Sequence, residues 1–349
     1  MLKNRLILLV VFLISSAICV SAQTTAKTFR GYVSGLPVQI NLTREGGKLT
    51  GNYFYTRIGK QLKLAGTIDA EGNFKLNETN AANKTTGEFS GKWVEEANAN
   101  GVRLEGEWRK PNSQDTLGFI ASEQMIAFTN GAKFISKTFA EKNKPKRFDI
   151  TVEYPQLSGA SAMATANFNQ MAKKLAMSSV VDFRKSMMAQ TAEDLKFLPA
   201  DMSNYLDIGY GVEWATNDII SIQFLNSTFT GGAHPNYYTE TLNFDVKSGK
   251  EIKLTDLFQS NSNYLKIISD YSIADLKTRL GEMSDDEWIG KGAGADAENY
   301  MSWNLTKKGL MISFDPYQVA AYAAGMQTVI IPYSKLAEVW RKDKMYAAN

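Results

Sequence analysis

The feature that most limits the fold is a short glycine pattern that recurs five times in the first third of the chain. Each copy reads apolar, x, Gly, x, apolar, at residues 29–33, 49–53, 64–68, 89–93 and 104–108. Alternate residues on a strand share one face, so each glycine falls between two large side chains on that face. A glycine there weakens a flat strand but suits a strand that bends sharply. Residues 27–122 are therefore predicted to form an all-β antiparallel meander that closes into a small barrel or sandwich.

The same pattern places aromatic residues along one face of the predicted strands, among them Tyr53, Trp93 and Trp108. Such a stripe is more often the core of the domain than the lining of a cavity. If it lined a cavity, the domain would carry a small apolar ligand. Both interpretations stay open from the sequence.

The periodicity changes after residue 147. Residues 123–147 are mixed and charged, and we interpret them as a linker. Beyond them, alternating apolar residues predict strands, whereas helical spacing around Phe168 and again from Leu265 to Leu280 predicts two main helices. Strands joined by short hairpins and covered by two helices indicate an α+β domain with an antiparallel sheet over residues 148–340.

The N-terminus predicts export. Lys3 and Arg5 precede an uncharged run, and a small-x-small site ends at Ala22, so residues 1–22 match a secretory signal peptide. Cys19 is the only cysteine and lies inside this signal, which excludes disulfides and thiolate metal sites from the mature chain. We expect a periplasmic or secreted protein with no transmembrane anchor after cleavage, since no later stretch is apolar enough to span a bilayer.

Composition excludes one class of partner. The net charge is +3, and Lys3 and Arg5 of the signal account for two of those charges. Nucleic acid binding requires concentrated positive charge, so no nucleic acid partner is expected.

Catalytic chemistry has few candidates. His234 is the only histidine, so a multi-histidine metal site is excluded, and no nucleophile elbow or phosphate-binding loop occurs. No metal or cofactor is predicted. A cell-wall hydrolase or esterase using His234 as its base remains an alternative. The other interpretation is a glycine-rich turn whose imidazole bonds a neighbouring backbone group.

The segment 314–325 joins two predicted strands and holds Tyr317 and Tyr322 among four alanines. Tyrosines on such a loop suit recognition, because each offers apolar area and a hydroxyl at modest entropic cost. The loop could instead fold back over the core as a lid.

Motifs of the C-terminal half resemble a known group of domains. They are Gly231-Gly232-Ala233-His234-Pro235-Asn236, Phe244-Asp245 with Gly249-Lys250, Leu254-Thr255-Asp256-Leu257-Phe258, the loop from Phe314 to Gly325, and Ile331-Pro332-Tyr333 with Leu336. In this order, over residues 148–340, they resemble the extracytoplasmic lysozyme-sensing domain of the anti-sigma-V factor. They are also similar to the accessory modules of PdaC-like peptidoglycan deacetylases.

This resemblance implies a binding function without catalysis. Its partner would be a lysozyme-like protein or a peptidoglycan fragment, and the residues of PdaC-type catalytic domains have no counterpart in this sequence. By position in the motifs, the expected contact residues are Tyr317, Ala321, Tyr322, Gly325, His234 and Pro235, with Tyr322 foremost. We therefore expect an exported binding protein of the cell envelope.

Overall fold

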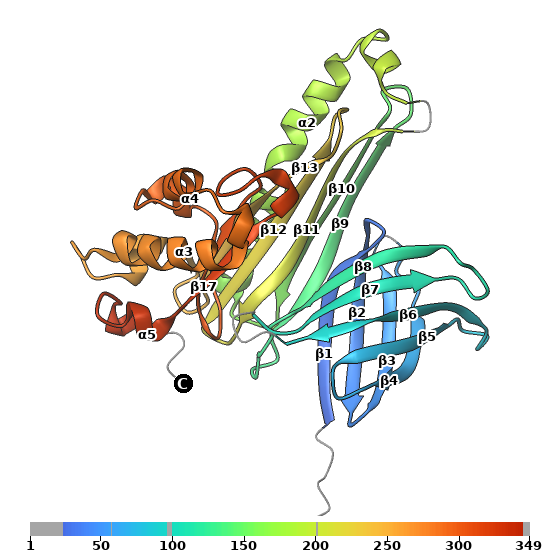
Figure 1. Cartoon of the computed structure of the whole chain (residues 1–349), viewed down its shortest axis with the longest axis horizontal. Helices are drawn as coiled ribbons and strands as arrows, with labels where there is room; N and C mark the ends of the chain where they lie inside the picture. Colours follow the sequence, from blue (N-terminus) through green and yellow to red (C-terminus); the bar gives the residue numbers. More distant parts are fainter. Residues whose placement is uncertain (1–23, 57, 96–99, 200–201, 345–349) are drawn as a thin grey trace, which may run out of the picture.

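The computed structural model describes residues 24–56, 58–95, 100–199 and 202–344. The predicted signal at 1–22, with Cys19, lies outside the described residues. The predicted fold class is confirmed, since an all-β barrel is followed by an α+β region (Figure 1). Within the described ranges, no helix has both the length and the apolar character needed to cross a bilayer.

The barrel is a closed antiparallel meander in which β8 returns to pair with β1. A Cβ added at Gly66 would overlap the carbonyl oxygen of Lys75 on the neighbouring strand, and one added at Gly51 would overlap that of Asn41. The recurring glycines therefore allow neighbouring backbones to approach closely as the sheet curves. Its strands are β1 (Thr24–Val33), β2 (Leu36–Glu45), β3 (Lys48–Tyr55), β4 (Leu62–Ile68), β5 (Asn73–Thr79), β6 (Thr85–Val94), β7 (Arg103–Arg109) and β8 (Thr116–Glu123).

A six-stranded sheet forms the centre of the molecule, in the order β14-β13-β12-β11-β10-β9. Neighbours are antiparallel except β10 and β11, which are parallel because helices α1 and α2 connect them. The strands are β9 (Lys133–Asn143), β10 (Phe148–Ser158), β11 (Asn204–Ala215), β12 (Ile219–Phe229), β13 (Asn236–Asp245) and β14 (Lys250–Glu251).

Helices α1 (Ala162–Ala176) and α2 (Ser178–Ala189) cover one face of this sheet. The Ser161 side chain caps α1 by accepting a hydrogen bond from the backbone N–H of Ala164. Phe168 and Ala172, four residues apart, then face the core, as the helical spacing predicts.

The linker prediction is wrong for residues 133–143, which form β9 and pair with β10 along its whole length. The error has a physical cause. This strand lies at the edge of the sheet, where charged residues such as Lys133 and Lys137 face solvent and discourage pairing with another chain. In a sequence, an edge strand with such exposed charges therefore resembles a linker.

The remaining elements pack on the opposite side of the large sheet and form a core of their own. Helix α4 includes the first three residues of the glycine-rich stretch 290–294. The three-stranded sheet is tied to β12 by buried polar groups, since Asn304 Nδ2 donates to Ser221 Oγ over 2.9 Å. These elements are α3 (Tyr264–Leu280), α4 (Asp286–Gly292), α5 (Tyr333–Leu336), β15 (Trp303–Leu305), β16 (Gly309–Phe314) and β17 (Gln327–Pro332).

The barrel is joined to the large sheet at a fork between two strands. β10 and β11 pair only as far as Val152 and Ile208 and then separate. The chain that leaves β8 takes over as the neighbour of β11, and Val212 N–H donates to Gln124 Oε1 over 2.8 Å. The backbone N–H of Ala215 likewise donates to the Met125 carbonyl oxygen. The last part of β11 thus exchanges hydrogen bonds with the segment that follows β8 of the barrel.

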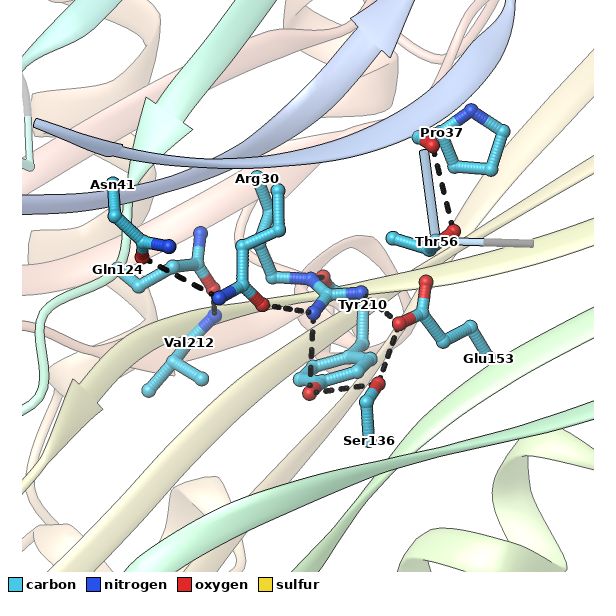
Figure 2. Close-up of polar contacts among 10 residues, drawn as sticks. Arg30, Pro37, Asn41, Thr56, Gln124, Ser136, Glu153, Tyr210 and Val212 are labelled. Carbon is cyan, nitrogen blue, oxygen red and sulfur yellow. Dashed lines mark hydrogen bonds and ion pairs between the residues drawn. The ribbon is translucent and has the colours of Figure 1, made fainter. Parts of the chain in front are cut away.

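Arg30 of β1 enters the same fork (Figure 2). Its Nε donates to the Tyr210 carbonyl oxygen over 3.1 Å, and its guanidinium lies 4.1 Å from the centre of the Tyr210 ring. A terminal guanidinium nitrogen lies 2.5 Å from Glu153 Oε1, and the two side chains are only 10% and 6% exposed. The Ser136 hydroxyl donates to the same carboxylate. A buried ion pair therefore holds the barrel against the sheet.

Candidate binding surface

The loop between β16 and β17 docks on the hairpin between β12 and β13, and this brings the two predicted motifs together. The Tyr322 hydroxyl donates to the Pro235 carbonyl oxygen over 2.6 Å. The Tyr322 ring stacks on His234 with 3.8 Å between ring centres. Tyr237 and Tyr317 complete an aromatic cluster, with ring centres 5.7 and 5.6 Å from that of Tyr322.

The base of the loop is a lid. Val319 and Ala320 are buried in the core beneath it. Asp315 fixes the start of the loop by accepting hydrogen bonds from the backbone N–H and the hydroxyl of Thr239. Burial raises the pKa of the Asp315 carboxyl, against the opposing effect of the bonds from Thr239.

The tip of the loop is displayed to solvent. Tyr317 is 53% exposed and has a positive φ of 69°, which a non-glycine residue rarely adopts. Ala321 is exposed. Gly325 also has a positive φ, and a Cβ built on it would lie 3.5 Å from the Tyr237 hydroxyl oxygen, which is an ordinary contact distance. Both sequence interpretations of this loop thus apply, to different residues. The Tyr322 side chain is half-buried and hydrogen-bonded to Pro235, whereas more than half of the Tyr317 side chain is exposed to solvent.

His234 contacts a backbone group of its own turn and the ring of Tyr322. Its ring is half-buried between the glycine-rich turn and Tyr322, and Nδ1 donates to the Pro235 carbonyl oxygen over 2.9 Å. In the part of the chain that the structure describes, no serine or carboxylate bonds to this imidazole. Nor do the described residues place three or more His, Cys, Asp or Glu side chains where they could share a metal ion.

A shallow depression of about 490 Å³ adjoins Tyr317, and sequence reasoning did not identify it. Trp288 forms one wall, and its indole N–H donates to the Tyr317 carbonyl oxygen over 2.8 Å. Gln318 also lines the depression, and its Nε2 donates to the carbonyl oxygens of Gly292 and Asn299. The acidic run before Trp288 was the available signal. Asp285 caps α4, and the helix that it begins presents Trp288 to the loop.

The barrel interior is filled by side chains. Tyr53 packs edge-to-face on Phe89 with 5.2 Å between ring centres, and Phe89 packs on Phe119 at 5.1 Å. Tyr53 and Trp93 are 0% and 5% exposed, so here the aromatic stripe is core. A buried carboxylate, Glu78, accepts hydrogen bonds from the Tyr53 hydroxyl and the Trp108 indole N–H. These contacts occupy the space that a carried apolar ligand would need.

Two known families match the C-terminal part of the chain. Residues 141–237 match the family described as deacetylase PdaC, and residues 255–334 match DUF3298, described as a protein of unknown function. The peptidoglycan-N-acetylmuramic acid deacetylase PdaC of Bacillus subtilis is 24% identical over 201 residues. That match covers 58% of this chain and 41% of the relative, so the chain spans about two fifths of that protein. The immunogenic protein MPT64 of Mycobacterium tuberculosis is 26% identical over 106 residues, or 30% of this chain and 45% of the relative.

Two solved structures are also similar. A DUF3298 family member from Bacteroides fragilis is 21% identical with a TM-score of 0.47, and covers 62% of this chain and 96% of its own. A DUF3298 family protein from Pseudomonas aeruginosa is 14% identical with a TM-score of 0.43, and covers 61% of this chain and 94% of its own.

The family matches confirm the predicted resemblance to PdaC-type modules and place it in the expected half of the chain. The link to lysozyme-sensing anti-sigma-V domains stays a prediction. The C-terminal half of this chain thus resembles PdaC-associated and DUF3298 domains, and the N-terminal barrel lies outside both family matches.

Proposed function

We propose that this chain is an exported, non-catalytic binding protein of the cell envelope. Its ligand is peptidoglycan or a lysozyme-like protein that acts on peptidoglycan. The observation that carries the proposal is the aromatic cluster of His234, Tyr237, Tyr317 and Tyr322, which presents Tyr317 beside the depression walled by Trp288. Exposed aromatic side chains on a braced loop supply binding area without a large entropic cost.

The comparisons support the peptidoglycan part of this proposal, because the B. subtilis relative is named as a peptidoglycan deacetylase. The motif resemblance to lysozyme-sensing domains supports the protein partner. Export is proposed from residues 1–22. The absence of catalysis is proposed from the arrangement of His234, whose described hydrogen bond is to the next residue's backbone.

The test is binding of the purified mature chain to insoluble peptidoglycan in a pull-down and to a c-type lysozyme by biolayer interferometry. Tyr317→Ala removes the exposed aromatic ring and should weaken binding by about 2 kcal/mol, or roughly thirtyfold. The matched control is Tyr238→Ala. Tyr238 is 38% exposed but points to the opposite face, where its hydroxyl bonds to Ser179 of α2.

Tyr322→Ala is a less direct probe, because it also removes the stack on His234 and the bond to Pro235. Its stability must therefore be measured alongside its affinity. Equal losses in Tyr317→Ala and Tyr238→Ala would reject the aromatic cluster as the binding surface. Release or deacetylation of muropeptides by the purified chain would contradict a non-catalytic role.

A further inference from the structure

A second cleft, which shares no lining residue with the depression beside Tyr317, lies where three structural units meet. It is bounded by the start of β7 and the end of β8 in the barrel, by β11 and β12 of the large sheet, and by α3 with β16 and β17. It encloses about 360 Å³, and a smaller depression of about 140 Å³ beside Arg30 shares three of its lining residues, Ser122, Glu213 and Gln223. Pockets of this size at unit boundaries are frequent ligand sites.

Glu213 stands at the junction of the two depressions because of an irregularity in its strand. The pairing of β11 with β12 shifts register between Val212 and Trp214, so Glu213 is the extra residue of a β-bulge. Bulges interrupt the regular alternation of side chains and re-aim one of them, and they are frequent beside functional sites. The re-aimed side chain here is a carboxyl group.

This carboxyl group lacks a cationic partner among the described residues. Its Oε2 accepts a hydrogen bond from Asn100 Nδ2 over 2.8 Å. Burial raises its pKa, and the bond from Asn100 only partly opposes the rise. A half-buried carboxyl group without a charge partner costs stability, so its presence in a cleft marks a candidate site.

The nearby cations are engaged elsewhere. Arg30 pairs with Glu153, Arg103 with Glu105, and Arg279 with Asp275. The carboxylate Glu123, at the end of β8, pairs with Lys27. Residues 96–99, which precede Asn100, contain no basic residue in the sequence. A positive charge to pair with Glu213 must therefore come from a group other than these side chains.

We propose that this cleft binds a ligand that carries a primary ammonium group on an alkyl stem, and that Glu213 receives the ammonium. The ammonium would supply the missing positive charge and donate to Glu213 Oε1 and to the side-chain oxygen of Gln223, whose Nε2 is engaged by Ser313. Met311, Met326 and Ile330 line the same cleft and suit the apolar stem. The site is separate from the aromatic cluster, so this proposal does not rest on the proposed function.

The experiment follows the titration of Glu213 directly, by NMR of the full mature chain labelled with carbon-13 at the glutamate carboxyl carbons. The Glu213 signal is assigned by its absence from Glu213→Gln. The probe is Nα-acetyl-lysine methylamide, and the neutral comparison is Nα-acetyl-norleucine methylamide. The lysine probe should lower the pKa of Glu213 and the norleucine probe should leave it unchanged. The same pKa with both probes would overturn the proposal.

Calorimetry gives a second measurement, the buffer dependence of the binding enthalpy, which a purely structural role of Glu213 would not affect. At a pH between the pKa values of the free and the ammonium-bound Glu213, binding releases a proton, so the apparent binding enthalpy should depend on the ionisation enthalpy of the buffer. Glu213→Gln keeps the side-chain shape and an acceptor for Asn100, but should abolish this dependence and weaken binding at least about tenfold. Glu240→Gln is the matched control, because burial also raises the pKa of Glu240 and Asn226 donates to it. Equal effects of the two variants would show that the cleft is not the site.

Discussion

Replacing Arg30 by methionine tests whether the buried ion pair holds the barrel to the large sheet. In Arg30→Met the Glu153 carboxylate stays 6% exposed and loses its cationic partner, keeping the Ser136 hydroxyl as a donor. Removing one member of a buried pair costs about 3–5 kcal/mol, because the remaining charge is left uncompensated. Unfolding free energies are only about 5–15 kcal/mol, so this loss should be large.

The assay is urea unfolding followed by tryptophan fluorescence, since Trp93 and Trp108 report on the barrel and Trp214 and Trp303 on the remainder. The barrel and the C-terminal region have separate hydrophobic cores. A weakened junction should therefore also split the transition into two steps. Arg30→Met combined with Glu153→Met should recover most of the lost stability, because the unpaired charge is gone.

The matched control is Arg109→Met, which breaks an exposed pair with Glu88 and should cost at most about 1 kcal/mol. The reasoning is refuted if Arg30→Met costs no more than this control. It is also refuted if the double variant loses the sum of the two single losses, which would mean that the charges do not depend on each other.

Two further predictions concern backbone packing and pH. Gly66→Ala should destabilise the barrel by about 1–3 kcal/mol through overlap with the Lys75 carbonyl oxygen, whereas Gly118→Ala, with nothing within 4 Å of its Cβ, should change stability by no more than about 0.5 kcal/mol. Thermal melts compare them, and equal losses would contradict the close-approach argument. The raised pKa of Glu213 favours the native state below the ordinary glutamate pKa, and this contribution is lost as pH rises through the native value. The Tm of Glu213→Gln relative to wild type should therefore increase between pH 4 and pH 8, and a constant difference would refute it.

The parts of the fold that follow from short-range pattern were predictable. Five glycines between apolar neighbours predicted a curved meander, because a missing Cβ is the one local feature that permits such close strand approach. The start of α4 is equally local, since Asp285 accepts a hydrogen bond from the backbone N–H of Trp288, three residues along the chain. The turn interpretation of His234 rested on adjacent glycines, and its bond to Pro235 is equally local.

The parts that failed or were missed depend on partners distant in the sequence. β9 was taken for a linker, because an edge strand exposes charges that also characterise connectors. These residues form a strand because they pair with β10, and no pattern within residues 133–143 indicates that pairing. The depression beside Tyr317 was missed for a similar reason, since Trp288 reaches the loop across 29 positions of sequence.

The sequence alone determined the class of each half, because strand curvature, helix caps and turns depend on side chains within a few residues of one another. Only the tertiary structure decided which groups share an environment. It set Tyr322 on His234, placed Arg30 against Glu153 in the fork of the sheet, and left the bulged Glu213 carboxyl group without a cation in a cleft. Burial and charge compensation depend on every neighbour in space, and chain segments separated by 88, 123 and 113 residues supply those neighbours here.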